Sequence, residues 1–182
     1  MKKIYKIYSR IKRCIIFKLD GINTNLYMKL YNSWLLNEKL DLKGPAKYIH
    51  STVSIDGIDY RRIHIGKNIV ISRNTILLIH DFSIEAGLLS VNKSNAQKNG
   101  KEAYIIDDIS IGNDCFIGAN VTILPGTIIG DNCIIGAGAV LPGKKFPSNS
   151  VIVGNPAKVI LKTDEWALKK YQEGKYISGF IQ

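Results

Sequence analysis

The chain has 182 residues, of which 46% are hydrophobic, and its formal net charge is +10 at pH 7. This length predicts one domain with appendages. The sequence holds no apolar stretch of about 18 residues that would span a membrane, and its longest apolar run near the start, 14–17, is too short for a signal peptide. We therefore expect a cytoplasmic protein.

Residues 1–20 are strongly basic, because seven lysines and arginines face one aspartate and give this segment +6 of the net charge. Apolar residues recur there at helical spacing, which predicts a basic amphipathic helix; they are Ile4, Ile7, Ile11, Cys14 and Ile15. The apolar side suits contact with an anionic membrane surface, or packing on the rest of the chain or a neighbouring subunit, and the pattern leaves both open. No nucleic-acid-binding module is recognisable, so we expect no nucleic-acid partner.

A second helix is predicted from Thr24, as its N-cap, to Leu40, and Gly44 with Pro45 ends it. The apolar face of this helix should pack against the domain that follows. We therefore divide off residues 1–46 as a basic helical extension and expect the first coil of the central domain near residue 47.

The central domain, 47–162, contains six-residue units that share one rule: an aliphatic residue opens the unit, and the fourth position tolerates a left-handed backbone. Nine units open at Ile65, Ile71, Leu77, Ile105, Ile111, Ile117, Ile123, Ile129 and Ile135. Asn, Asp, His and Gly enter positive φ at low cost, and they fill the fourth positions Asn68, Asn74, His80, Asp108, Asp114, Asn120, Gly126, Asn132 and Gly138. Openers and fifth residues should point inward. Three units would then close one coil of a triangular prism, whose coils stack as parallel strands.

The repeat is interrupted once. The distance along the chain from Leu77 to the next opener, Ile105, is not a whole number of six-residue units, so we expect residues 83–104 to leave the prism as an excursion loop. The loop is polar and rich in turn residues. Loops of this length in compact domains are usually functional or disordered, and its position directly after His80 favours a function.

The end of the chain is predicted to close the prism. A last coil should run from Val151 to Ile160, and a helix should begin at Thr163 and reach about Gln172. We expect this C-terminal segment, 163–182, to cap the last coil, since an uncovered coil exposes strand edges.

Cysteine and histidine spacing argues against a metal site. Cys115 and Cys133 are three units apart, which is one coil, and should stack as small core residues rather than form a disulfide or bind a metal. The spacing between His64 and His80 is not a whole coil, and no third histidine follows on a later coil. We therefore expect no bound metal.

The string IGNDCFIGANVTILPGTIIGDNCIIGAGAV, followed by GNPAKVI, resembles the left-handed parallel β-helix (hexapeptide-repeat) acyltransferases, and more narrowly their sugar and polysaccharide O-acetyltransferase branch. The resemblance is strong over 105–160 and looser over 53–83. It implies an all-β, left-handed parallel β-helix, a homotrimer with sites between subunits, and direct transfer of acetyl from acetyl-CoA to a hydroxyl of a sugar or glycan.

His80, in LLIHDFS, is the candidate base. At a corner before the excursion its imidazole should project outward, where it can accept a proton near neutral pH. The resemblance places the family's catalytic histidine here, and it implies that a backbone N–H near Ala119 stabilises the oxyanion. Asp81 and Glu85 would orient His80 or bind the acceptor, or they are ordinary surface charges.

The resemblance also implies where coenzyme A lies. Its pantetheine arm would follow a groove lined by small residues, Ala119 and Ala137, which are one coil apart, with Phe116 beside it. The phosphates and adenine would meet basic and polar side chains further on; these are Lys144, Lys145, Asn155, Lys158 and Lys162. The chain departs from the family pattern at Pro142-Gly143 and at Leu161, which leaves individual phosphate contacts open.

Three alternatives remain at this stage. The basic first helix favours a large or lipid-linked glycan acceptor at the inner face of the plasma membrane. N-acetylation of a nucleotide-linked amino sugar, or acetylation of an antibiotic, would use the same chemistry. The alternative from another class is a non-catalytic trimeric scaffold, which would show no affinity for coenzyme A.

Overall fold

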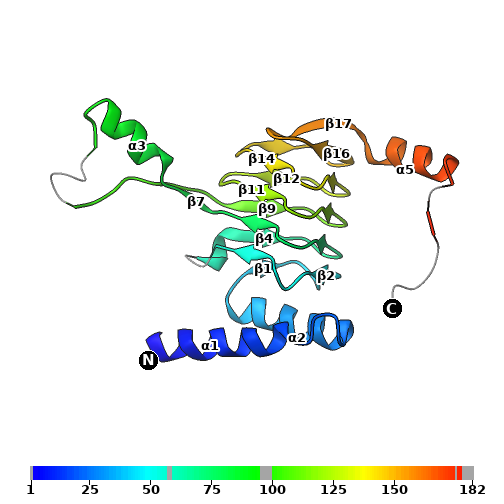
Figure 1. Ribbon diagram of the computed structural model, residues 1–182, viewed down its shortest axis with the longest axis horizontal. Helices are drawn as coiled ribbons and strands as arrows, with labels where there is room; N and C mark the ends of the chain where they lie inside the picture. Colours follow the sequence, from blue (N-terminus) through cyan, green and yellow to red (C-terminus); the bar gives the residue numbers. More distant parts are fainter. Residues whose placement is uncertain (1, 57–58, 95–99, 175, 178–182) are drawn as a thin grey trace.

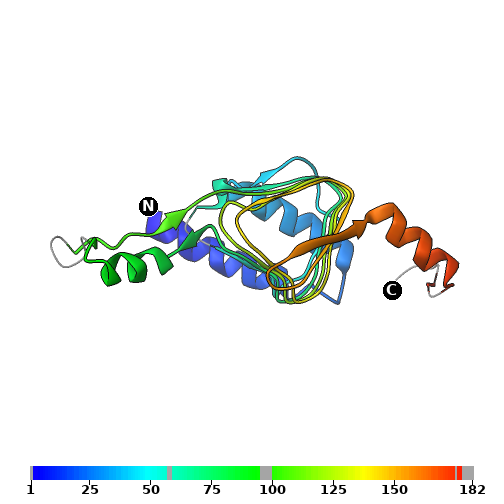
Figure 2. The ribbon, with the colours of Figure 1, turned by 90° about the horizontal axis from the view of Figure 1, so that it is seen from above.

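The computed structural model describes residues 2–56, 59–94, 100–174 and 176–177. It is a triangular prism of stacked coils with two helices beneath it and two projections from its sides (Figures 1 and 2). Seen from above, the chain advances toward the viewer while it turns clockwise, so the coil is left-handed (Figure 2). The predicted fold, a left-handed parallel β-helix, is confirmed.

The strands of the coils form three sheets, parallel except for the last strand of one of them, which we call faces A, B and C in chain order. Face A holds β1 (Asp41–Leu42), β4 (Ile63–Ile65), β9 (Ile109–Ile111), β12 (Ile128–Ile129) and β15 (Lys145–Phe146). Face B holds β2 (Tyr48–Ile49), β5 (Val70–Ile71), β10 (Phe116–Ile117), β13 (Ile134–Ile135), β16 (Ser150–Val153) and β17 (Lys158–Lys162). Face C holds β3 (Ser54–Ile55), β6 (Ile76–Leu77), β11 (Thr122–Ile123) and β14 (Val140–Leu141). We name the corners AB, BC and CA by the faces that they join.

The predicted repeat rule holds over most of the prism. Openers such as Ile65, Ile117 and Ile135 are fully buried, as are the fifth residues Thr75 and Cys133. Positive φ occurs at the predicted corner residues Asn68, Asn74, Asp114, Asn120, Gly126, Asn132 and Gly138. The buried thiols of Cys115 and Cys133 are free, and the Cys133 N–H lies 3.4 Å from the Cys115 sulfur. A local rule of backbone conformation and inward aliphatic residues therefore specifies the coil.

Two predicted units are wrong. His80 and Asp108 do not have positive φ, and Ile105 is 46% exposed instead of buried. The reason is that the chain leaves the prism at β7 (His80–Asp81) and returns at β8 (Ile105–Ile106), and these strands pair antiparallel with each other. Ile79 and Ile109 are fully buried and take the inward places on either side of the excursion.

The excursion projects from corner CA and contains helix α3 (Ser83–Ser90), where the sequence had predicted only a loop over 83–104 (Figures 1 and 2). Glu85, in the first turn of this helix, is buried. Its carboxylate accepts hydrogen bonds from the Ser94 hydroxyl and from the Ala103 N–H at 2.7 Å. One carboxylate thus ties the outgoing and returning arms together.

Helices α1 (Lys2–Phe17) and α2 (Thr24–Asn37) lie beneath the first coil (Figure 1). The N-cap of α2 is Asn23, one residue before the predicted Thr24, and its side chain accepts from the Leu26 N–H at 2.9 Å. The predicted packing of α2 is confirmed, because buried Tyr27 donates to the carbonyl of Ile49 on face B at 2.6 Å. Strand β1 already joins face A, so the first coil begins at Asp41 rather than near the predicted residue 47.

The apolar stripe of α1 does not pack on the chain's own prism. Ile4, Ile7, Ile11 and Ile15 are 73%, 54%, 56% and 61% exposed. The helix docks instead through its other side, where Ser9 and Ile16 are buried. Of the interpretations left open, packing of this stripe on the same chain is therefore excluded.

The C-terminal segment also differs from its prediction. Val151 to Ile160 is not a further coil, because β17 reverses direction and pairs antiparallel with β16 on face B. A short 3-10 turn, η1 (Tyr60–Arg62), and helix α5 (Thr163–Gln172) complete the elements. Helix α5 projects sideways and buries none of its residues, so it does not cap the last coil of this chain (Figure 2).

Candidate active site

His80 lies at corner CA, where the chain leaves the prism. Its Nδ1 is hydrogen-bonded to the carboxylate of Asp56, which follows β3 on the first coil. The Asp56 side chain is 5% exposed and the His80 side chain 24% exposed. The same carboxylate accepts from the Ile79 N–H at 3.3 Å, which fixes it against the strand that carries the histidine.

This pairing sets the tautomer of His80. An ionised carboxylate can only accept hydrogen bonds, so Nδ1 carries the proton and Nε2 presents its lone pair. A histidine held in this way by a buried carboxylate is oriented to take a proton at Nε2 and is stabilised when it becomes positively charged. The geometry would allow proton transfer at Nε2.

The residues predicted to orient His80 have other partners. Asp81 accepts from the Ser83 N–H at 2.8 Å at the start of α3, and Glu85 is engaged within the excursion. Donation from Ser94 and from the Ala103 amide lowers the pKa of Glu85. The prediction that either carboxylate orients His80 is wrong. Asp56 was missed because the first coil is longer at this point than three six-residue units, which brings Ile55 opposite Leu77.

Two aromatic rings adjoin His80 on the excursion. The Phe82 ring lies 5.4 Å from the imidazole at 85°, and Tyr104 lies 5.2 Å from Phe82. Both are about half exposed, at 46% and 49%. They form an apolar surface with a polar hydroxyl directly beside the His80 imidazole, a typical lining of small-molecule sites. Only the tertiary structure brings Tyr104 to this place.

Corner BC carries a second group of predicted residues. Ala119 and Ala137 stack there, and the Ala119 carbonyl accepts from the Gly138 N–H at 2.9 Å. Coils approach closely at this corner, since a Cβ on Gly118 would lie 2.6 Å from the Ala137 nitrogen. Phe116, on face B before this corner, is 45% exposed.

The backbone amide of Ala119 is available at this corner. Its neighbours Gly118 and Asn120 donate to the carbonyls of Ile135 and Arg73 at 2.9 and 3.0 Å. Within the part of the chain that the structure describes, no acceptor is found for the Ala119 N–H. A backbone amide without an acceptor inside the chain can donate to a developing oxyanion.

The predicted phosphate-binding residues divide between corners. Asn155 and Lys158 lie at or next to corner BC, because the turn between β16 and β17 bonds to Val140 through the Gly154 carbonyl and the Ala157 amide. Lys144 lies at corner CA, with its ammonium 5.1 Å from the Phe146 ring centre. Lys145 begins β15 on face A, and Lys162, opposite Ser150, ends β17 near corner AB. The last three are therefore not beside Ala119 in the same chain.

His80 and Ala119 lie at opposite ends of face C. His80 follows β6 and Ala119 precedes β11, so one face, a six-residue segment, separates their corners. Six extended residues span about 20 Å. His80 and Ala119 of one chain are therefore too far apart to contact one small group together.

The other histidines are engaged elsewhere. His64 Nδ1 lies 2.9 Å from Asp41 and its Nε2 lies 3.4 Å from Asp108, while His50 bonds to Thr52. Among the described residues, no group of three or more His, Cys, Asp or Glu is arranged to hold a metal ion. A search of the same residues for a helix both long and apolar enough to cross a bilayer finds none.

Comparison with known sequences places the chain in a family. The family model described as bacterial transferase hexapeptide (six repeats) matches residues 108–143. The chain is 30% identical over 166 residues to "Putative acetyltransferase YvoF" of Bacillus subtilis (strain 168), which covers 90% of this chain and 84% of that protein. It is 50% identical over 54 residues to "Putative lipopolysaccharide biosynthesis O-acetyl transferase WbbJ" of Escherichia coli (strain K12), which covers 30% of this chain and 27% of that protein.

Solved structures share the fold. A maltose O-acetyltransferase from Clostridium difficile 630 aligns with a TM-score of 0.54 and 24% identity, over 86% of this chain and 87% of that one. A hexapeptide-repeat acetyltransferase from Vibrio cholerae O1 biovar eltor, complexed with acetyl coenzyme A, aligns with a TM-score of 0.55 and 16% identity, over 85% and 87%. The chain belongs to the hexapeptide-repeat family of bacterial transferases. Its class within that family is that of an acyltransferase.

Proposed function

We propose that the protein is an acetyl-CoA-dependent O-acetyltransferase that acts on a hydroxyl of a sugar or bacterial surface glycan, with His80 as its general base. The observation that carries this proposal is the pair formed by His80 and the buried carboxylate of Asp56. A surface histidine needs no such partner, whereas a proton acceptor gains both orientation and charge stabilisation from one.

The reaction needs no covalent enzyme intermediate. Nε2 of His80 takes the proton of the acceptor hydroxyl while the oxygen attacks the thioester carbon. The carbonyl oxygen becomes an oxyanion, to which the Ala119 N–H donates. The tetrahedral intermediate collapses, the carbon–sulfur bond breaks, and the imidazolium returns its proton to the sulfur of coenzyme A. The products are the acetyl ester and free coenzyme A.

Acetyl-CoA is the proposed co-substrate. The Vibrio cholerae relative binds acetyl coenzyme A, and a galactoside acetyltransferase that shares the fold binds coenzyme A. We assign the pantetheine arm to the groove at Ala119 and Ala137, with Phe116 at its side. Its phosphates and adenine would meet Asn155 and Lys158 at the same corner, with Lys144 and Lys145 supplied by corner CA and the adjoining face A of the neighbouring copy. Lys162 lies near corner AB, so we assign it no phosphate contact.

We further infer that the working enzyme is a homotrimer. Corner CA with His80 and corner BC with Ala119 are separate in one chain, so a complete site needs corner CA of one copy against corner BC of the next. Such a contact joins two different surfaces, and its repetition closes a ring; the family resemblance implies a ring of three. The sedimentation mass should then be three times 20.3 kDa, and a stable monomer with full activity would refute the assembly.

The acceptor is proposed from what surrounds His80. The exposed rings of Phe82 and Tyr104 provide a surface on which a sugar ring can lie, and Asp81 at the mouth of the excursion can accept from its hydroxyls. Glu85 is committed to the excursion itself, so we assign it no acceptor contact. The similarity to WbbJ supports a surface glycan. A cytoplasmic location at the inner membrane face fits the exposed apolar stripe of α1 and the high positive charge of that helix.

The test is a pair of measurements. Titration of acetyl-CoA into the protein should show saturable binding, and its absence in a folded protein would favour the non-catalytic scaffold. The rate of acetyl transfer to sugars and oligosaccharides, measured by the release of the coenzyme A thiol, should fall about 10²–10⁴-fold in His80→Ala. His50→Gln, at the histidine two coils below the Ala119 turn and bonded to Thr52, should keep the rate. Transfer only to a nucleotide-linked amino sugar would replace the O-acetyl assignment.

A further inference from the structure

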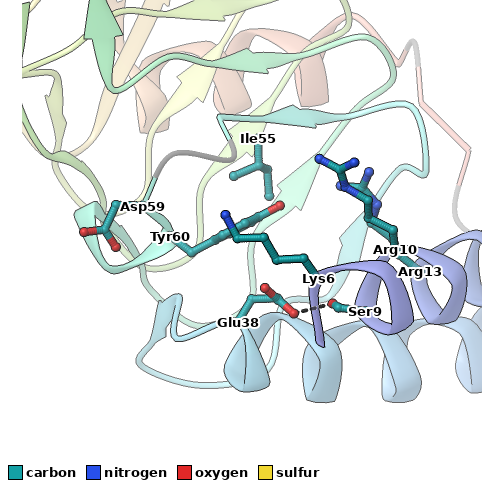
Figure 3. A pocket seen from close by; sticks show the side chains of 8 residues that line it. All are labelled: Lys6, Ser9, Arg10, Arg13, Glu38, Ile55, Asp59 and Tyr60. Atoms are coloured by element: carbon teal, nitrogen blue, oxygen red, sulfur yellow. Dashed lines mark hydrogen bonds between the residues drawn. The ribbon is translucent and has the colours of Figure 1, made fainter. Parts of the chain in front are cut away.

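A second hollow lies between α1 and the first coil, apart from the half-site at corner BC. Its volume is about 420 Å³. It is lined by Lys6, Ser9, Arg10 and Arg13 of α1, Glu38 after α2, Ile55 of β3, and Asp59 and Tyr60 at the 3-10 turn (Figure 3). We call it the α1 pocket. Its wall on the helix side is formed by three basic side chains of a helix that contains no acidic residue.

The two carboxylates of the α1 pocket are already bonded. Glu38 accepts from the Ser9 hydroxyl and, at 3.4 Å, from the Tyr5 hydroxyl. Asp59 accepts from Nε and Nη2 of Arg61 at 2.8 and 2.7 Å, and this bidentate contact lowers the pKa of Asp59 to about 2. In Figure 3 the Asp59 carboxylate lies at the far rim, away from the basic groups of α1.

The basic groups are not neutralised by these acids. Across the described residues, no salt bridge is formed by Lys6, Arg10 or Arg13. Lys6 and Arg10 are four residues apart, and Arg10 and Arg13 three, so their like charges repel along one side of the helix. An anion in the α1 pocket would relieve that repulsion.

One of these cations is held rigidly. The Arg13 guanidinium lies 5.7 Å from the ring centre of Phe17 and 5.4 Å from that of Trp34. Trp34 is itself buried and donates to the Ser9 hydroxyl at 2.9 Å. Stacking on aromatic faces fixes a guanidinium without using its N–H donors in an ion pair. Arg13 is therefore preorganised to donate.

Tyr60 completes the donor set. Burial raises the pKa of its hydroxyl, so the group stays protonated at neutral pH and can donate. In Figure 3 the Lys6 ammonium and the Tyr60 hydroxyl lie below Ile55, and the guanidinium groups of Arg10 and Arg13 lie to its right. Several cationic donors with a neutral hydroxyl match the three or more oxygens of a phosphoryl group better than the two of a carboxylate.

The α1 pocket also lies on the active-site side of the prism. Ile55 in its wall precedes Asp56, the residue that holds His80. Both views place the N-terminal half of α1 on the side from which the excursion projects (Figures 1 and 2). The volume exceeds that of one phosphate and leaves room for an attached group.

We propose that the α1 pocket binds a phosphoryl group, as phosphate or pyrophosphate, through Lys6, Arg10, Arg13 and Tyr60. We assign this phosphoryl group to the acceptor glycan, which the α1 pocket would hold while a distant hydroxyl of the same glycan reaches His80. This assignment rests on the proposed function. The binding itself does not.

The experiment is calorimetric titration of inorganic pyrophosphate into the full chain without acetyl-CoA. Arg10→Gln should weaken binding about tenfold or more, because a charge-assisted contact is lost. Tyr60→Phe, which keeps the ring, should weaken it less. The matched control Lys169→Gln on α5 removes the same charge far from the pocket and should leave the affinity unchanged. Equal affinity in Arg10→Gln and wild type, or no binding to wild type, would overturn the proposal.

Two further arms identify the source of the phosphoryl group. Glucose 1-phosphate is titrated as the soluble source, and vesicles of phosphatidylcholine with and without phosphatidic acid present a lipid headgroup. If the affinity for glucose 1-phosphate depends on Arg10, the ligand of the α1 pocket is a soluble or glycan phosphate. If Arg10-dependent binding is confined to vesicles with phosphatidic acid, the ligand is a membrane headgroup. Because no acetyl transfer is measured, a failure here leaves the acetyltransferase proposal standing, and a failure of acetyl transfer leaves the pocket standing.

Discussion

Mixing two inactive variants tests whether the active site is shared between chains. His80→Ala removes the base at corner CA. Ala137→Trp, at an exposed position of corner BC, fills the groove assigned to pantetheine. His80→Ala alone should lower the rate about 10²–10⁴-fold, because the general base is absent. Ala137→Trp alone should also be nearly inactive, because the thioester is displaced.

The magnitude of the restored activity follows from the geometry. If each site takes corner CA from one copy and corner BC from its neighbour, a randomly reassembled equal mixture has both halves intact in about a quarter of its sites. The specific activity should therefore recover to about a quarter of the wild-type value. If both halves came from one chain, no site in the mixture would be intact.

The assay is thiol release from acetyl-CoA after the two variants are unfolded together, refolded and separated by size. Sedimentation of each variant alone must give the mass of the wild-type assembly, so that a failure of Ala137→Trp to associate is recognised. A co-refolded mixture of correct mass with no more activity than the separate variants would refute the shared site. A second mixture, His80→Ala with Asp56→Asn, serves as control, because both changes affect corner CA and no complementation is expected.

Three further results are expected. Gly112→Ala should destabilise the prism by about 1–3 kcal/mol in urea unfolding, because its Cβ would lie 2.5 Å from the Gly130 carbonyl carbon. Gly87→Ala on α3, where a Cβ would meet nothing within 4 Å, should be neutral or slightly stabilising. Equal unfolding midpoints for the two variants would contradict the close packing at Gly112. The lowered pKa of Glu85 means that its contribution to stability is present above the ordinary glutamate pKa of about 4.3 and is lost as pH falls through the lower folded pKa. Protease cleavage of the excursion should therefore rise when the pH falls through the folded pKa of Glu85, and it should be raised already at pH 7 in Glu85→Gln. A cleavage profile unchanged by both treatments would contradict the role of Glu85 in holding the excursion. Ile11→Ser on α1 keeps every charge but makes the exposed apolar stripe smaller, so the variant should float less with anionic vesicles than the wild type does. Equal flotation of the two proteins, or no flotation of either at low salt, would exclude the membrane contact.

The parts of this protein that follow a local rule could be predicted from its sequence. Positive φ at Asn120 and Gly138, burial of Ile117 and stacking of Cys115 under Cys133 depend on residues within one coil and its neighbour, and the pairing of Ile117 with Ile135, one coil later, agrees. The same periodicity located His80 at the edge of an interruption. Helix α5 was predictable for the similar reason that its N-terminal acidic residues and its end are local signals.

Tertiary structure decided what local patterns leave open. Asp56 reaches His80 because the first coil has an irregular length, and no periodic rule gives that register. Ile105 fits the repeat yet is exposed, because β8 pairs with β7 outside the prism. The stripe on α1 has the pattern of a packed helix, but Ile16 and the opposite side make the contact. In each case the determining interaction joins residues far apart in the chain, and its free energy depends on which surfaces the assembled coils present.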